Sequence, residues 1–299
     1  MITYATLDEF KNMKDFEKTG LVTLPAAALD KIRDYLKMGT RYIERTTKRS
    51  FVPYYATKTY PVPHRFHDLA IRRFPTANLR LDEDLLEVVT MNNGVSDLVE
   101  STDYFLLENN IYPKNLVALK FPNYWGGISG INLKRYDEPV INITGFWGFA
   151  DKMYPINFWV DSLEVIGVGG ITASTTTITV LNADGSDSMD ELRFTENMML
   201  RIDDELLEVT DVNTTTNVLT VLRGVRGSTA AIHAAGTQIT RWRVIDDIKQ
   251  VCLQVAKTWR EANIAVGGRI GVSDVSAGVE IGIPADPLAI IKMYVKTIL

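Results

Sequence analysis

Apolar residues at helical spacing occur in two segments that lie far apart in this chain of 299 residues. In each segment every member lies three, four or seven residues from another member, which places the side chains on one face of an α-helix. Asp246 and Asp247 precede the second series, and either can cap a helix N-terminus. We therefore expect a helical core. The two series are Leu29, Ile32, Leu36 and Ile43, and Ile248, Val251, Cys252, Val255, Trp259 and Ala262.

Between these segments the sequence follows strand patterns, with short runs rich in β-branched and aromatic residues. An Asn-Gly step at Asn93-Gly94 follows one run and favours a tight turn. Because no helical pattern separates the runs, they predict an antiparallel sheet and not a βαβ alternation. The fold class is α+β. The runs are residues 55–60, 85–89, 103–107, 116–119 and 140–148.

Residues 163–243 differ from the rest of the chain, because aromatic residues are scarce and Thr, Asp, Val and Gly are frequent. Short strand patterns and turn signals fill this stretch, which predicts a small all-β module inserted into the main domain. An insertion requires its two ends to lie close together. The predicted division is 1–162 for the helical and β part of the main domain, 163–243 for the module, and 244–299 for the closing helix, a Gly-rich tether and an extended tail that ends in a short helix.

The tail begins its last helix at Asp286-Pro287, a helix cap followed by proline at the first helical position. An isolated helix of this length is marginal in water, so it must dock. No core of its own is evident, and it docks either on its own domain or in a groove of a partner. The predicted docking residues are Pro287, Leu288, Ile291, Tyr294, Val295 and Ile298.

Charge is unevenly distributed along the chain, although the net charge is only −5. Residues 1–80 hold 15 Lys or Arg and 8 Asp or Glu, whereas residues 81–110 hold 8 acidic residues and no basic one. A basic stripe at helical spacing can meet an acidic protein surface or phosphates, or it is a solvated face. The stripe consists of Arg41, Arg45, Lys48 and Arg49.

Motifs of catalysis are missing from the sequence. It has no phosphate-binding loop and no nucleophile elbow. One cysteine, Cys252, excludes an intramolecular disulfide and a multi-cysteine zinc site, which fits a reducing compartment. His64 and His67 with Asp68 form at best a weak metal candidate, and loop histidines are the default interpretation. We expect a chain that is not an enzyme, binds no metal or cofactor, has no secretion signal and does not enter a membrane.

Several segments, taken in their order, resemble the head–tail connector (adaptor) proteins of long-tailed bacteriophages. The resemblance covers about residues 26–160 and 244–299, so the main domain would be a connector domain. The segment from Ile143 to Phe149 is similar to an aromatic strand of that family, and the helix that follows Asp246 takes the place of the family's closing helix. The remaining segments that carry the resemblance are 42–51, 57–60, 81–88 and 101–107.

The resemblance implies a structural role in the virion, at the head–tail interface, after assembly in the host cytoplasm. Family members form a ring, typically dodecameric, that joins the portal protein to a neck, stopper or tail-terminator protein. Phage DNA passes through the ring without sequence-specific binding, so we expect acidic surface nearer the channel than the basic stripe. The C-terminal segment would dock on the portal. The alternatives are a tail or host-surface protein that binds carbohydrate through the module, and a phage hydrolase.

Overall fold

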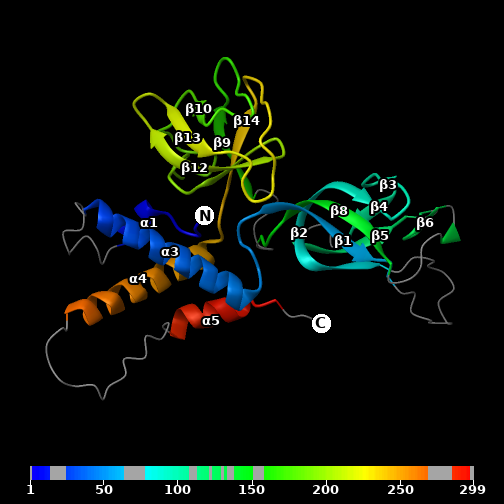
Figure 1. Cartoon of the computed structure of the whole chain (residues 1–299), viewed down its shortest axis with the longest axis horizontal. Coiled ribbons are helices and arrows are strands. Elements are labelled where there is room, and N and C mark those ends of the chain that lie inside the picture. Colours follow the sequence, from blue (N-terminus) through cyan, green and yellow to red (C-terminus); the bar gives the residue numbers. More distant parts are fainter. Residues whose placement is uncertain are drawn as a thin grey trace.

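The computed structural model describes residues 2–13, 25–63, 78–107, 113–120, 123–128, 131–132, 138–150, 158–268 and 285–296. Figure 1 shows a group of helices, a sheet beside them and a separate β-module above. Over these ranges the chain has four helices and two antiparallel six-stranded sheets, so the α+β class is confirmed. The expected helical core is wrong, because most of the regular structure is β and each sheet has an apolar cluster of its own.

The helices come from the two ends of the chain and pack together in Figure 1. Both long helices follow the predicted periodicity, and Leu36 of the first and Val255 of the second are fully buried in one cluster. The two helices are in contact at Gly39, where an added Cβ would lie 3.4 Å from the carbonyl oxygen of Cys252, an ordinary van der Waals distance. The second helix runs through Gly267 and Gly268, where the sequence predicted non-helical chain. The helices are α1 (Leu7–Lys11), α3 (Ala26–Thr47), α4 (Asp246–Gly268) and α5 (Ala285–Met293).

The first sheet has the order β1-β8-β2-β5-β4, with β3 paired to β2. It confirms the predicted antiparallel sheet, and every predicted run overlaps one of its strands. Gly94 forms the predicted tight turn at φ +96°, where a Cβ would lie 2.5 Å from the side chain of Val140. The strands are β1 (Tyr54–Pro61), β2 (Leu79–Asn92), β3 (Asp97–Leu98), β4 (Tyr104–Leu106), β5 (Lys114–Leu119) and β8 (Pro139–Trp147); β6 (Gly127–Ile128) and β7 (Ile131–Asn132) form a separate pair.

The second sheet has the order β10-β13-β12-β11-β14-β9 and encloses the core of the module. The strands that come first and last in the sequence, β9 and β14, are hydrogen-bonded neighbours in this sheet. The sheet therefore enters and leaves the main part of the chain at one place, and its first strand begins before residue 163. The strands are β9 (Trp159–Val165), β10 (Thr177–Thr179), β11 (Met199–Ile202), β12 (Glu205–Asn213), β13 (Val218–Leu222) and β14 (Gln238–Trp242).

Arginine and tryptophan side chains fasten the module to the rest of the chain. The guanidinium of Arg201 binds both carboxylate oxygens of Glu87 at 2.6 and 3.0 Å and lies 4.1 Å from the ring centre of Phe146. The indole nitrogen of Trp242 donates to the carbonyl of Phe51 at 2.8 Å. These contacts hold the module against both the first sheet and the segment that follows α3.

Candidate docking surfaces

The C-terminal helix α5 packs against its own chain. Ile291 is fully buried in the cluster that α3 and α4 share. The ring of Tyr294 lies edge-on to Phe51 at 5.6 Å and to Phe149 at 5.7 Å, centre to centre. A buried isoleucine beside three aromatic rings gives this short helix the apolar support that it lacks in isolation.

Polar contacts fix the end of the same segment. The backbone N–H of Lys296 donates to the carbonyl of Thr47 at 2.9 Å, at the end of α3. The ammonium of Lys296 lies 3.5 Å from the carboxylate of Asp84 on β2. The hydroxyl of Tyr294 bonds the carboxylate of Asp247 at 3.2 Å. The tail thus connects α3, α4 and the first sheet.

The six predicted docking residues divide between the two sides of this helix. Ile291 and Pro287 are buried, Leu288 and Tyr294 are half-buried, and Val295 is exposed; Ile298 lies outside the described residues. The expectation that the helix has no core within its own chain was wrong, because α3, α4 and the aromatic pair of Phe51 and Phe149 provide one. Docking on its own domain was the other alternative, and contact with the portal stays a prediction.

A small charged cavity of about 70 Å³ lies where this segment meets the end of α3. Asp84 faces Arg49 at 2.9 Å as well as Lys296, and Glu83 is bonded by both Lys58 and Tyr54. Burial raises the pKa of Glu83, but the hydrogen bonds from Lys58 and Tyr54 outweigh it and lower that pKa overall. The cavity is several times smaller than a typical ligand pocket of about 300 Å³ or more, and its carboxylates are already paired, so its chemistry is structural.

Three of the four residues of the predicted basic stripe form one exposed ridge on α3. Arg41, Arg45 and Lys48 are exposed, and no ion pair connects them to any described residue. Arg49 departs from the stripe, because Lys48 adopts a left-handed conformation at φ 55° and ends the helix. Its guanidinium turns inward to Asp84 and lies 4.4 Å from the ring centre of Phe149. We call Met38, which is 48% exposed, together with Arg41, Arg45 and Lys48 the basic ridge.

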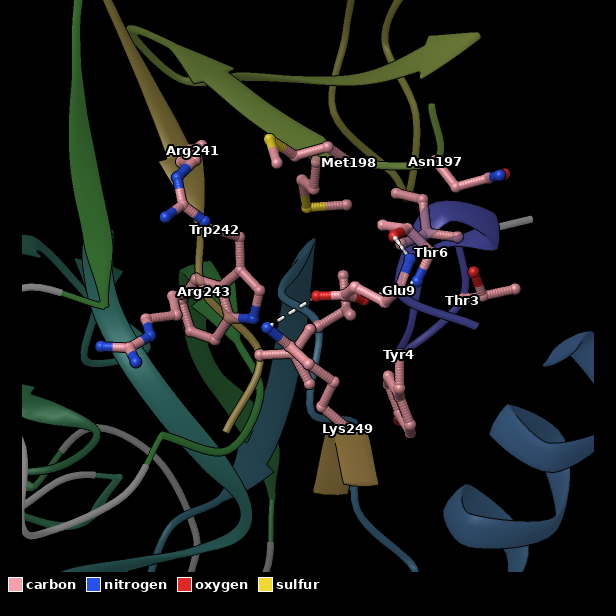
Figure 2. A pocket seen from close by; sticks show the side chains of 14 residues that line it. Thr3, Tyr4, Thr6, Glu9, Asn197, Met198, Arg241, Trp242, Arg243 and Lys249 are labelled. Carbon is pink, nitrogen blue, oxygen red and sulfur yellow. Dashed lines mark hydrogen bonds and ion pairs between the residues drawn. The ribbon is translucent and has the colours of Figure 1, made fainter. Parts of the chain in front are cut away.

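A second cavity, of about 50 Å³, lies between the N-terminal segment, the module and the start of α4 (Figure 2). The ion pair of Glu9 and Lys249 at 2.9 Å crosses it. Glu9 also receives the backbone N–H of Thr6, and the Thr6 hydroxyl caps α1 in return. Because the polar groups of Glu9, Lys249 and Thr6 are already paired and the space holds little more than water, this cavity is a packing gap and not a ligand site.

All six arginines of the module are engaged in ion pairs or hydrogen bonds with this chain, a feature that counts of charged residues do not reveal. Residues 161–243 contain no lysine and six arginines. Five of these arginines pair with carboxylates, and Arg226 donates to the backbone carbonyls of Pro53 and Val52. The five are Arg193, Arg201, Arg223, Arg241 and Arg243, whose nearest carboxylate partners are Glu164, Glu87, Glu205, Asp187 and Asp246.

One buried group of these charges closes the loops at one end of the module. Glu205 binds the guanidinium of Arg223 through both oxygens and lies 2.8 Å from Nε2 of His233. The other ring nitrogen of His233 lies 2.7 Å from Asp203. Burial raises the pKa of Glu205, yet Arg223, the N–H of Ala231 and His233 together lower it overall.

Neither a metal cluster nor a membrane segment occurs in the part of the chain that the structure describes. There, no three His, Cys, Asp or Glu side chains gather as a metal site, and none of the helices has the length and apolar character needed to span a bilayer. His64, His67 and Asp68 lie outside the described residues. No family model and no curated protein sequence matches the chain.

Proposed function

We propose that the protein is a structural head–tail adaptor of a tailed phage, which forms a ring between the portal and the neck. The observation that carries the proposal is that the segments behind the resemblance fold together. Helices α3 and α4, from opposite ends of the sequence, pack on each other, and β1, β2 and β8 are adjacent strands of one sheet. The separate segments that carry the resemblance thus belong to one folded unit, and the module projects from it (Figure 1).

The C-terminal helix is the proposed portal contact, but only some of the six predicted docking residues are available for it. Ile291 and Tyr294 hold the helix on its own chain. The side chains left for the portal are the half-buried Leu288 and the exposed Met293 and Val295. A small apolar contact of this kind is weak, but repetition around a ring multiplies it through avidity.

Electrostatics indicates which charged surface of the chain would face the proposed channel. A passage for DNA must not bind phosphates tightly, so acidic surface from residues 81–110 lies nearer the lumen than the basic ridge. The ridge then meets an acidic protein surface. A ring structure in which Arg41 and Arg45 project into the channel would overturn this part of the proposal.

Electron microscopy of the purified chain, with and without portal, tests the proposal directly. We expect rings on the portal vertex, and loss of attachment in the triple variant Leu288→Ser, Met293→Ser, Val295→Ser. A matched control replaces Val99, an exposed residue directly after β3, by serine and should attach normally. Portal particles that stay bare with the unaltered chain would refute the adaptor role. Binding on a glycan array would favour the carbohydrate-binding alternative, and substrate turnover lost on a point substitution would favour a hydrolase.

A further inference from the structure

We propose that one apolar edge of the module docks on the basic ridge of α3 in a second copy of this chain. The inference deepens the proposed function, on which it rests, because it names the contact that would close the ring. The contact is heterologous: each copy offers its module edge to one neighbour and its α3 ridge to the other.

The module edge consists of four large apolar side chains that face solvent. We call them the leucine edge: Leu163 (57% exposed), Leu181 (81%), Met189 (42%) and Leu192 (59%). They belong to two segments that are bonded to each other, β9 and the loop 181–193. The N–H of Leu181 donates to the carboxylate of Glu164 at 2.7 Å, and the N–H of Ser188 donates to the carbonyl of Asp161 at 3.1 Å.

The backbone at Leu163 shows that this exposure is built into the fold. Leu163 has φ 60°, a left-handed conformation that is uncommon outside glycine. The carboxylate of Asp161 accepts the N–H of Leu163 at 2.8 Å and holds this turn. Beneath it, Arg193 pairs with Glu164 in the interior. An ordered and locally strained segment therefore presents a leucine to water, which is typical of a contact surface.

The charge around the leucine edge has one sign. Asp184 and Asp190 are exposed in the same loop. No lysine occurs in the module, and the nearby arginines Arg193 and Arg241 are buried in ion pairs. Arg243, whose guanidinium lies 3.6 Å from the sulfur of Met189, pairs with Glu191 and Asp246. The edge is therefore apolar at its centre and acidic at its rim.

The basic ridge has the complementary composition. Met38, Arg41 and Arg45 follow each other at intervals of three and four residues, so they form one line along α3 of about 10 Å at 1.5 Å per residue. Lys48 follows directly after the end of the helix. The ridge places one exposed apolar residue beside three cations that pair with no described residue. Apolar contact of Met38 with the leucines and pairing of the cations with the acidic rim satisfy both surfaces.

Disulfide trapping tests the contact. In the variant Met38→Cys/Leu181→Cys, copper phenanthroline and oxygen should link copies into a ladder on a non-reducing gel. A mixture of the two single variants should give only dimers. Cys252 is buried and contributes no surface thiol. The matched control Met38→Cys/Leu222→Cys uses a leucine that is 50% exposed elsewhere on the module and should give no ladder.

Charge reversal tests the pairing. Arg41→Glu/Arg45→Glu and Asp184→Lys/Asp190→Lys should each weaken self-association by about tenfold or more, and a mixture of the two variants should restore it. Unchanged unfolding midpoints would show that these surface substitutions leave the fold intact.

The two proposals fail separately. If rings form on the portal but the reversed variants assemble normally and no ladder appears, the leucine-edge contact is wrong and the adaptor role stands. If the ladder forms but the chain never binds portal, the contact stands and the adaptor role falls. A chain that does not self-associate under any of these conditions overturns the contact, as does an edge that binds only portal or glycan.

Discussion

Replacement of Ile291 by alanine measures how firmly the C-terminal helix is held by its own chain. The side chain is fully buried, and the substitution removes three carbon atoms. At about 0.8 kcal/mol per buried CH₂ group, the loss of apolar transfer free energy alone is about 2.4 kcal/mol. The cavity left between α3, α4 and α5 raises the expected loss in the free energy of unfolding to about 3–4 kcal/mol. If α5 instead detaches from its own chain, the loss in the free energy of unfolding equals the free energy with which α5 packs on α3 and α4.

Urea denaturation gives the loss of stability, and amide hydrogen exchange over residues 285–296 distinguishes a tolerated cavity from an undocked helix. Met293→Ala is the matched control, because Met293 lies two residues away on the same helix and is 78% exposed. We expect that variant to stay within about 0.5 kcal/mol of the unaltered chain. Equal effects of the two substitutions would refute the packing of α5 on its own core.

Three further predictions concern the module and the helical core. Gly227→Ala should destabilise the chain by clearly more than the roughly 1 kcal/mol of a backbone penalty, because a Cβ would collide with the carbonyl oxygen of Tyr55; Gly236→Ala has a similar positive φ but open space, and thermal unfolding should separate the two. The lowered pKa of Glu205 means that its stabilising contribution is complete above the unfolded value of about 4.3 and is lost as the pH falls through the lower folded pKa. Between about pH 6 and 3, the denaturation midpoint should therefore fall less in Glu205→Gln than in the unaltered chain. At neutral pH this variant should already have lost about 3–5 kcal/mol in its free energy of unfolding, because Arg223 loses its charged partner. Parallel pH profiles of the two proteins would contradict this assignment. Burial raises the pKa of Cys252 to about 12, so a thiol reagent should label it only as fast as the chain unfolds, and rapid labelling of the native chain would show that α3 and α4 do not enclose it.

Local patterns predicted the elements whose buried positions are apolar. The apolar stripe of α3 and the apolar series on α4 both lie on helices, as predicted. Strand β9 escaped prediction because its inward positions alternate Val160, Ser162 and Glu164. Ser162 and Glu164 are buried because Ser162 bonds the carbonyl of Ile239 and Glu164 pairs with Arg193. Hydrophobic periodicity cannot detect a strand whose interior is polar and satisfied by distant partners.

The C-terminal helix shows that hydrophobic periodicity can detect a helix and still not identify which of its residues are buried. The sequence predicted a seam through Leu288, Ile291 and Val295, and the periodicity of an amphipathic helix is visible there. The structure instead buries Ile291 and Pro287, with Tyr294 against two aromatic rings, and leaves Val295 exposed. Which side of a short helix is buried depends on the surface that receives it. Here Phe51 and Phe149, far away in the sequence, provide that surface.

Counts of charged residues likewise do not predict the charge of the exposed surface, and that surface charge matters for how copies of the chain would assemble. The sequence assigns the module a moderate acidic excess, which alone predicts only weak long-range attraction to basic partners. The structure places its arginines in buried pairs or on backbone carbonyls, while Asp184, Asp190, Asp203, Asp204 and Asp211 stay exposed. The surface that a partner meets is therefore far more one-sided than the composition. On α3 the reverse holds, because Arg49 turns inward and the remaining cations align with Met38. In the proposed contact, opposite charges at exposed surfaces would guide and orient copies, but such charges contribute little affinity in salt. The apolar residues at the centre of each surface would therefore have to supply most of the binding free energy.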